Sequence, residues 1–172
     1  MKIIISGKGR DSMDKEFISY IREITSSKEF QRMKKHKHHI NGTVYGHSVK
    51  VAYLCYRHHK RYGLKMDIKE LIIGALLHDY YLYNLHGVGE KHRFHWFKHP
   101  KCALKNALKK YPDLTDMQRD MIKHHMFPLT PIPPKTKAGW LICFYDKVAA
   151  ISDRFETKKN RKISFHNIPS KQ

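Results

Sequence analysis

An adjacent histidine and aspartate end an otherwise apolar segment in the stretch IIGALLHDYYLYN, residues 72–84. If this segment is helical, residues seven apart lie nearly one above the other. His78 then continues the line of the apolar Leu71. Asp79 likewise continues the line of Ile72, so both side chains point toward the core. A buried carboxylate is unfavourable unless it is paired or protonated, so this pair requires a cationic side chain or a metal ion.

Two other segments raise the same electrostatic problem. Taken alone, His78 could be an ordinary core histidine and Asp79 a cap of local backbone. However, Asp146 lies inside the most apolar segment of the chain, and His47 opens another segment with apolar residues close behind it. A divalent cation between two buried carboxylates and two histidines would satisfy all four. Such ligands suit manganese, iron, nickel or zinc, and helical bundles build metal sites from facing helices.

The pattern that positions these residues is helical almost throughout, because no strand-like alternation lasts more than a few residues. We expect helices over residues 11–24, 27–36, 47–63, 67–79, 99–111, 116–126 and 138–155. The boundary signals are a C-terminal Gly63, capping boxes at Asp67 with Glu70 and at Thr115 with Gln118, and Pro100 at a first helical position. The segment 138–155 is apolar nearly all round and is therefore expected at the centre of the bundle.

The length of 172 residues fits one domain. We expect residues 1–35 to form a helical segment packed on a domain of residues 36–155. A basic tail over residues 156–172 contains little apolar material and is expected to be frayed or laid on the surface.

Charge and cysteine content limit the partners and the compartment. The 34 Lys and Arg residues against 15 Asp and Glu give a net charge of +19, which attracts phosphorylated small molecules, nucleic acid or an anionic membrane surface. No apolar run approaches the roughly 20 residues needed to span a bilayer, so we expect no membrane partner. Three cysteines without CxxC spacing indicate a reducing, cytoplasmic compartment. The oligomeric state stays open.

The order HSVKVA, GALLHDYY and CFYDKVAA is similar to the HD-domain superfamily of metal-dependent phosphohydrolases, whose ligand pattern is H…HD…D. The resemblance covers roughly residues 36–153. It implies an all-α, single-domain bundle of about six to seven helices, and hydrolysis of a phosphate ester or phosphoanhydride by metal-activated water. Carried over by position, it implies His47, His78, Asp79 and Asp146 as metal ligands. Asp79 would also be catalytic, bridging the metals or orienting the water.

Two further motifs, FKHPKCALKNA and IKHHMFPLT, resemble HD proteins with a binuclear centre. The resemblance implies that His99 and either His124 or His125 bind a second metal, so one or two divalent transition metal ions (Fe, Mn, Ni or Zn) are expected. Helical spacing fits both late histidines, and similarity to an HMxPL segment favours His125. His99 could instead be a surface histidine that caps a helix. The chain lacks the GYP sequence of HD-GYP proteins, so cyclic-dinucleotide hydrolysis is not expected.

Cationic and aromatic residues near these motifs suggest how a substrate is held. Lys50 lies one turn from His47, and Lys98 directly precedes His99, so both are candidates to bind the substrate phosphate. Solvated surface lysines are the simpler explanation in a chain this basic. The aromatic and histidine-rich segment 80–98 predicts either a lid that stacks a base or an apolar cover on the core.

The sequence therefore predicts a hydrolase of a phosphorylated small molecule, most plausibly a nucleotide or dinucleotide. The alternative is a nucleic-acid-associated protein whose metal site is structural or acts on a phosphodiester backbone. The basic segments KKHKHH and KKNRK support this alternative. No helix-turn-helix, zinc-finger or RNA-binding signature accompanies them.

Overall fold

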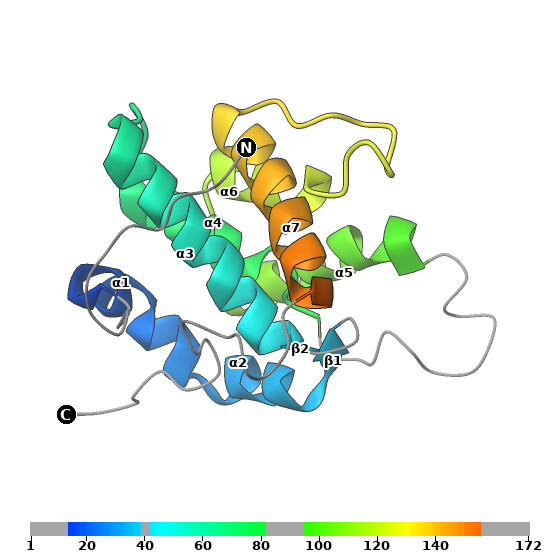
Figure 1. The fold of residues 1–172 in the computed structure, drawn as a ribbon. Coiled ribbons are helices and arrows are strands. Elements are labelled where there is room, and N and C mark those ends of the chain that lie inside the picture. Colours follow the sequence, from blue (N-terminus) through cyan, green and yellow to red (C-terminus); the bar gives the residue numbers. More distant parts are fainter. Residues whose placement is uncertain (1–13, 39–41, 82–94, 156–172) are drawn as a thin grey trace.

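The computed structural model describes residues 14–38, 42–81 and 95–155. The described part forms seven α-helices, one short 3₁₀ helix and two strands of two residues each (Figure 1). The helices are α1 (Lys15–Ser26), α2 (Lys28–Arg32), η1 (Met33–Lys35), α3 (Val44–Tyr62), α4 (Ile68–Leu77), α5 (His95–Lys110), α6 (Asp116–His124) and α7 (Lys137–Phe155). Strands β1 (Lys37–His38) and β2 (Gly42–Thr43) pair antiparallel. The all-α prediction is confirmed, and the predicted basic tail lies outside the described residues.

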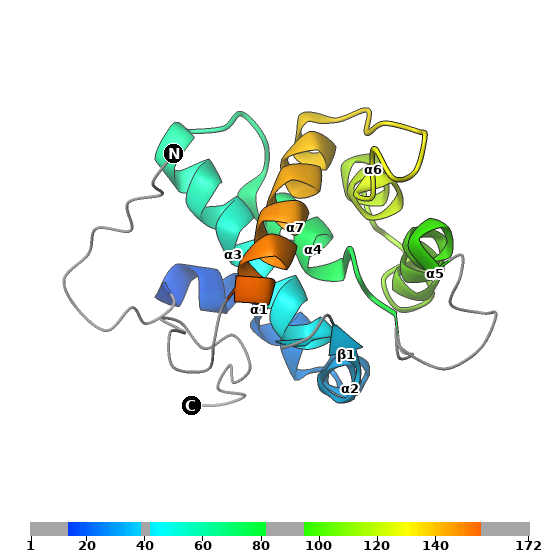
Figure 2. The ribbon, with the colours of Figure 1, turned by 45° about the vertical axis from the view of Figure 1, so that its right-hand side comes forward.

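Helices α3, α4, α6 and α7 form the centre of the bundle. Helix α4 packs against α3 and α6, and α7 packs against the same two helices from the other side. Helix α5 packs on α6, while α1, α2 and η1 cover the opposite flank, against α4 and the start of α3 (Figures 1 and 2). The starts of α3 and α5, the ends of α4 and α6 and the middle of α7 are thereby brought together in the interior.

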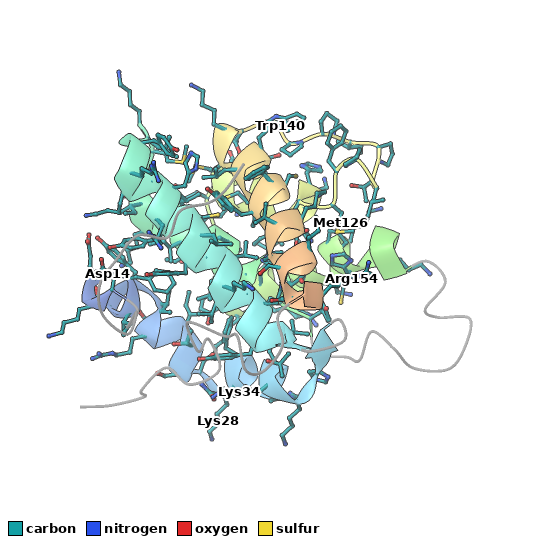
Figure 3. All side chains as sticks on the ribbon, in the orientation of Figure 1. Asp14, Lys28, Lys34, Met126, Trp140 and Arg154 are labelled. Atoms are coloured by element: carbon teal, nitrogen blue, oxygen red, sulfur yellow. The ribbon has the colours of Figure 1, made fainter. Side chains whose placement is uncertain are left out.

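The core is one continuous apolar cluster drawn from all these helices (Figure 3). Helix α4 contributes Leu71, Ile72, Ala75 and Leu76, all fully buried, so it is the innermost helix. Helix α7 lies at the centre of the bundle as expected, but it is not buried on every side. Its inner stripe is buried, but three of its large apolar side chains, Trp140, Phe144 and Ile151, expose about half of their surface.

Capping residues fix where the site-bearing helices begin. The Thr43 hydroxyl accepts a hydrogen bond from the Gly46 N–H at 3.1 Å, so α3 begins at Val44 and His47 lies in its first turn. Gly63 ends α3 in the left-handed conformation, with φ of 56°, as the sequence predicts. The capping box of Thr115 and Gln118 is also confirmed.

The box at Asp67 forms only in part. Asp67 accepts the Glu70 N–H at 2.7 Å, but the Glu70 carboxylate accepts a hydrogen bond from the Thr115 hydroxyl instead of returning to Asp67. This contact ties the start of α4 to the start of α6.

Several predicted boundaries are wrong. Helix α3 begins at Val44 and not at residue 47, and α6 ends at His124 and not at residue 126. Helix α4 ends at Leu77, so His78 and Asp79 follow the helix rather than complete it. Helix α5 begins at His95, which places Pro100 inside the helix and not at its first position. A proline near a helix start removes only one main-chain hydrogen bond, which the helix tolerates. Pro100 therefore does not identify the first residue of α5.

Candidate metal centre

Six ionisable side chains from five helices meet in the interior, and each exposes 9% of its surface or less. They are His47 in the first turn of α3, His78 and Asp79 directly after α4, His99 in α5, His125 directly after α6, and Asp146 in α7. Asp146 lies in the middle of α7, whereas the other five residues lie in the first two turns of a helix or directly after one, and the packing of these helices brings all six together. We call these six residues the cluster.

The first half of the cluster surrounds Asp146. Its Oδ1 lies 3.0 Å from Nε2 of His47 and 3.7 Å from Nε2 of His78. Oδ2 of Asp79 lies 3.5 Å from the same nitrogen of His78 and 4.0 Å from that of His47. His47, His78 and Asp146 each offer a ligand atom, and these atoms lie within 4.8 Å of one another.

The second half of the cluster surrounds the other oxygen of Asp79. Oδ1 lies 3.3 Å from Nε2 of His99 and 3.5 Å from Nε2 of His125. The two Nε2 atoms are themselves 2.9 Å apart. Asp79 therefore turns one carboxylate oxygen toward each half.

Main-chain carbonyls orient two of the imidazoles. Nδ1 of His78 donates to the carbonyl of Ala75 at 2.7 Å, and Nδ1 of His125 donates to that of Ile122 at 2.9 Å. Each Nε2 is then directed into the cluster, as in histidines that bind metals. Nε2 of His78 is buried and makes no hydrogen bond within the described part of the chain.

The electrostatics of the cluster favour a cation. Burial would raise the pKa of Asp146, but the hydrogen bond with His47 and the nearby imidazole of His78 hold it well below its usual range. Burial would lower the pKa of His47, whereas Asp146 and Asp153 raise it to about 10. Burial, together with the neighbouring His78 and His99, lowers the pKa of His125 and so favours the neutral imidazole. Imidazole nitrogens and carboxylate oxygens in this arrangement form a donor set that fits a divalent transition metal.

A comparison with protein-family models matched the HD domain over residues 44–157, a range that includes all six residues of the cluster. The chain belongs to the HD domain family. Searches of curated proteins and of solved structures found no match. HD domains are in general metal-dependent phosphohydrolases, and the buried cluster is compatible with that chemistry.

The structure of this HD domain separates the two late histidines. His125 belongs to the cluster, whereas His124 points away and its Nδ1 lies 2.8 Å from Oδ1 of Asp120. Asp120 also accepts hydrogen bonds from the main-chain N–H groups of Lys135 and Thr136. Of the predicted metal ligands, His124 is therefore the one that the structure does not bring to the cluster.

The two predicted phosphate-binding lysines differ in their surroundings. Nζ of Lys50 is largely buried and donates to Asp153 Oδ1 at 2.8 Å and to the Ser152 hydroxyl at 3.0 Å. Lys98 is exposed on α5, one residue before His99. Phosphate binding stays a prediction for both, and the observed contacts of Lys50 are with the end of α7.

Asp153 is a site residue that the sequence analysis missed. Its Oδ2 lies 3.4 Å from Nδ1 of His47, and its Oδ1 accepts the hydrogen bond from Lys50. Burial would raise the pKa of Asp153, but His47 and Lys50 hold it well below its usual range. The carboxylate therefore orients His47 so that Nε2 faces Asp146. The available signal was spacing, because Asp153 lies seven residues after Asp146 and so on the same face of α7.

The aromatic residues after Asp79 lie in two different surroundings. Tyr80 packs in the core, where its ring stacks on Phe30 with centroids 6.2 Å apart. Tyr81 is buried beside the cluster, 5.9 Å from the ring of His99. The rest of the predicted lid, residues 82–94 and the side chains of residues 95–97, lies outside the described residues.

Proposed function

We propose that this HD domain hydrolyses a phosphate ester or phosphoanhydride of a phosphorylated small molecule, with a nucleotide or dinucleotide as the favoured substrate. The observation that carries the proposal is the position of Asp79, whose two oxygens face two different sets of imidazole nitrogens. Membership of the HD domain family supports the reaction type. The net charge of +19 supports an anionic substrate.

We assign the six residues of the cluster to two ions, drawn from Fe, Mn, Ni and Zn. His47, His78 and Asp146 would hold the first, and His99 and His125 the second, with Asp79 shared between them. Bound there, such ions lower the pKa of water and polarise a phosphoryl oxygen.

The residues of this chain contribute orientation and exclusion of bulk solvent. In the proposed mechanism, Asp79 accepts a hydrogen bond from the attacking water and so aligns it with the phosphorus atom. Asp153 and the carbonyls of Ala75 and Ile122 keep the imidazoles in one orientation. Burial strengthens each electrostatic contact to the developing charge. Exposed Lys98 next to His99 is the better placed of the two lysines to bind a phosphate from outside.

The test is turnover by metal-reconstituted protein against nucleotides, dinucleotides, a simple phosphomonoester and short RNA. We expect hydrolysis of a phosphorylated small molecule, loss of that hydrolysis in Asp79→Ala, and retention in Asp113→Ala, a matched change at an exposed aspartate. The nucleic-acid alternative predicts instead that no small molecule is hydrolysed and that oligonucleotides bind with a steep dependence on salt concentration.

A further inference from the structure

Exposed apolar side chains gather at one end of the molecule. Among the described residues, six large apolar side chains expose about half of their surface or more: Tyr62, Leu129, Ile132, Trp140, Phe144 and Ile151. All but Ile151 belong to the last residue of α3, the loop between α6 and α7, or the first two turns of α7. These three segments lie at the upper end of both Figure 1 and Figure 2, where the start of α7 stands between the end of α3 and the loop. We call these five residues the apolar end.

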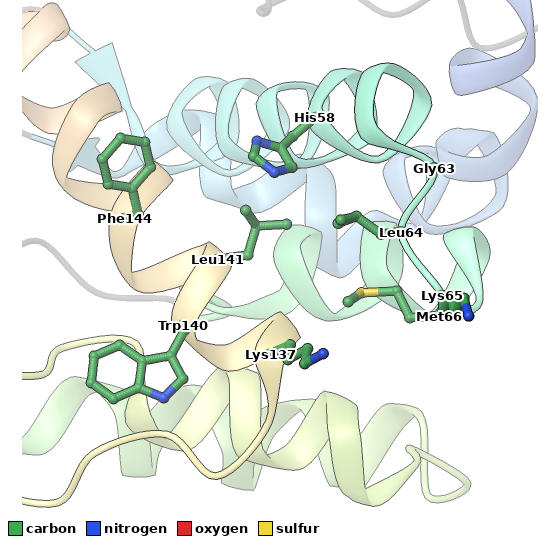
Figure 4. Close-up of a pocket in the computed structure, with 9 residues that line it drawn as sticks. All are labelled: His58, Gly63, Leu64, Lys65, Met66, Lys137, Trp140, Leu141 and Phe144. Atoms are coloured by element: carbon green, nitrogen blue, oxygen red, sulfur yellow. The ribbon is translucent and has the colours of Figure 1, made fainter.

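A groove of about 530 Å³ lies at the apolar end, between the end of α3 and the start of α7 (Figure 4). Trp140 and Phe144 project from α7 on one side, and Leu64 and His58 lie opposite. The residues that line the groove include two lysines, Lys65 and Lys137, and no carboxylate. Apolar surface with a cationic border is therefore the chemistry offered to a partner.

More cations surround the apolar end. Arg61 is exposed, with its guanidinium 5.6 Å from the centre of the Tyr62 ring. Lys135 is exposed in the loop that precedes α7. Together with the net charge of +19, these side chains favour an anionic surface as the partner.

We propose that the apolar end docks on the surface of a membrane that contains anionic phospholipids. Tryptophan and tyrosine side chains favour the interface between lipid and water, and lysine and arginine side chains beside them favour anionic headgroups. Leu129 and Ile132 project from a loop and would enter the outer acyl region. None of the described helices is long and apolar enough to cross a bilayer, so the contact is peripheral.

No membrane partner is expected from the sequence, because no single apolar run is long enough to span a bilayer. The apolar end is assembled from three segments that are separate in the sequence, so only the fold makes it visible. Two other occupants fit less well. A second copy of this chain would bring the lysines and arginines of both copies face to face. Nucleic acid would use the cations and the aromatic rings, but would leave Leu129 and Ile132 exposed to water.

The test is co-sedimentation of the full chain with vesicles of phosphatidylcholine, with and without phosphatidylglycerol. We expect binding only when phosphatidylglycerol is present, and weaker binding as salt is added. The double change Trp140→Ser with Phe144→Ser should weaken binding by about tenfold or more, because it removes two apolar side chains from the lipid contact. Ile151→Ser is the matched control, since Ile151 is as exposed on the same helix but lies outside the apolar end.

A second double variant, Leu129→Ser with Ile132→Ser, should weaken binding in the same way, and it replaces the first if that one melts differently from the wild type. Four results would overturn the proposal. The first is that the chain does not bind phosphatidylglycerol vesicles, and the second is that neither double variant weakens vesicle binding. The third is that the chain binds short RNA instead of vesicles and the double variants abolish RNA binding. The fourth is that the chain forms a dimer that the double variants dissociate.

Discussion

Asp79 and Asp120 are both buried beside histidines, yet their surroundings differ. Asp120 is satisfied by the protein, since it accepts hydrogen bonds from the N–H groups of Lys135 and Thr136, from the Thr136 hydroxyl and from His124. Asp79 is instead faced by four imidazole nitrogens at 3.3 to 4.0 Å. These belong to His47, His78, His99 and His125.

The difference separates a structural contact from a candidate metal site. Asp120 fastens the end of α6 to the start of α7, and Gly139 leaves it room, because a Cβ there would come within 2.7 Å of its Oδ2. Around Asp79 the carbonyl contacts of His78 and His125 turn Nε2 of each ring inward, an arrangement that is compatible with a metal ion. His124 and His125 are neighbours in sequence, yet His124 contacts Asp120 whereas His125 lies beside Asp79.

Replacing each aspartate by its isosteric amide gives the largest contrast. Asp79→Asn should lower hydrolysis by about a thousandfold or more and remove bound metal, because the shared carboxylate serves both halves of the cluster. Asp120→Asn should leave the metal content and the activity of the folded protein unchanged. Turnover and metal analysis of both variants measure this contrast, and equal losses of metal in the two would contradict it.

The adjacent histidines give the next contrast. His125→Gln should reduce bound metal from two ions per chain to one, because it removes a ligand of the second half only. His124→Gln should keep both ions and lose some stability. Metal analysis after reconstitution, with a thermal melt of each variant, distinguishes them, and a loss of metal in His124→Gln alone would reverse the assignment.

Asp153 contacts the cluster through His47, so replacing Asp153 tests whether this neighbouring carboxylate raises the affinity of the cluster for metal. Asp153→Asn should weaken metal binding by about 10- to 100-fold without changing the number of ions, as for other carboxylates that orient a metal-binding histidine. Titration calorimetry on metal-free protein measures the affinity. Asp113→Asn is the control, and an unchanged affinity in Asp153→Asn would limit Asp153 to a structural role.

The smallest effect concerns the stability contributed by Asp120. Burial would raise its pKa, but hydrogen bonds from Thr136, Lys135 and His124 hold the pKa below the ordinary value of 3.8. The ionised carboxylate therefore stabilises the fold at neutral pH, and that contribution disappears as the pH falls through and below this value. Asp120→Asn should lower the free energy of unfolding by about 1–3 kcal/mol at neutral pH and by less in acid.

Urea denaturation of the wild type and of Asp120→Asn, at neutral and at acid pH, measures this difference in the free energy of unfolding. A difference that is larger in acid would show that the carboxylate is not the stabilising group.

The sequence predicted much of the cluster because buried charge is conspicuous on apolar helices. His47 and Asp146 stand on such helices, His78 directly follows one, and the two-residue pattern at Asp79 added the shared carboxylate. Spacing did not separate His124 from His125, because both positions fit the helical repeat that begins at Met117 and Met121. Asp153 was missed because the polar last turn of α7 reads as solvent-exposed until α3 packs against it.

Most of the predicted helices were found, since their caps at Gly63 and Thr115 are local signals. The exposed side of α7 was not predicted. A helix that is apolar on every side is expected to be buried. Whether a neighbouring element covers each side depends on tertiary packing, however, which the sequence of one helix does not determine.

The metal content of the purified, reconstituted protein tests the central claim most directly. Two equivalents of a divalent transition metal per chain, falling to one in both His99→Gln and His125→Gln, are the expected result. One equivalent that neither substitution changes would confine the site to His47, His78, Asp79 and Asp146. A wild-type protein that binds no transition metal would contradict the account as a whole.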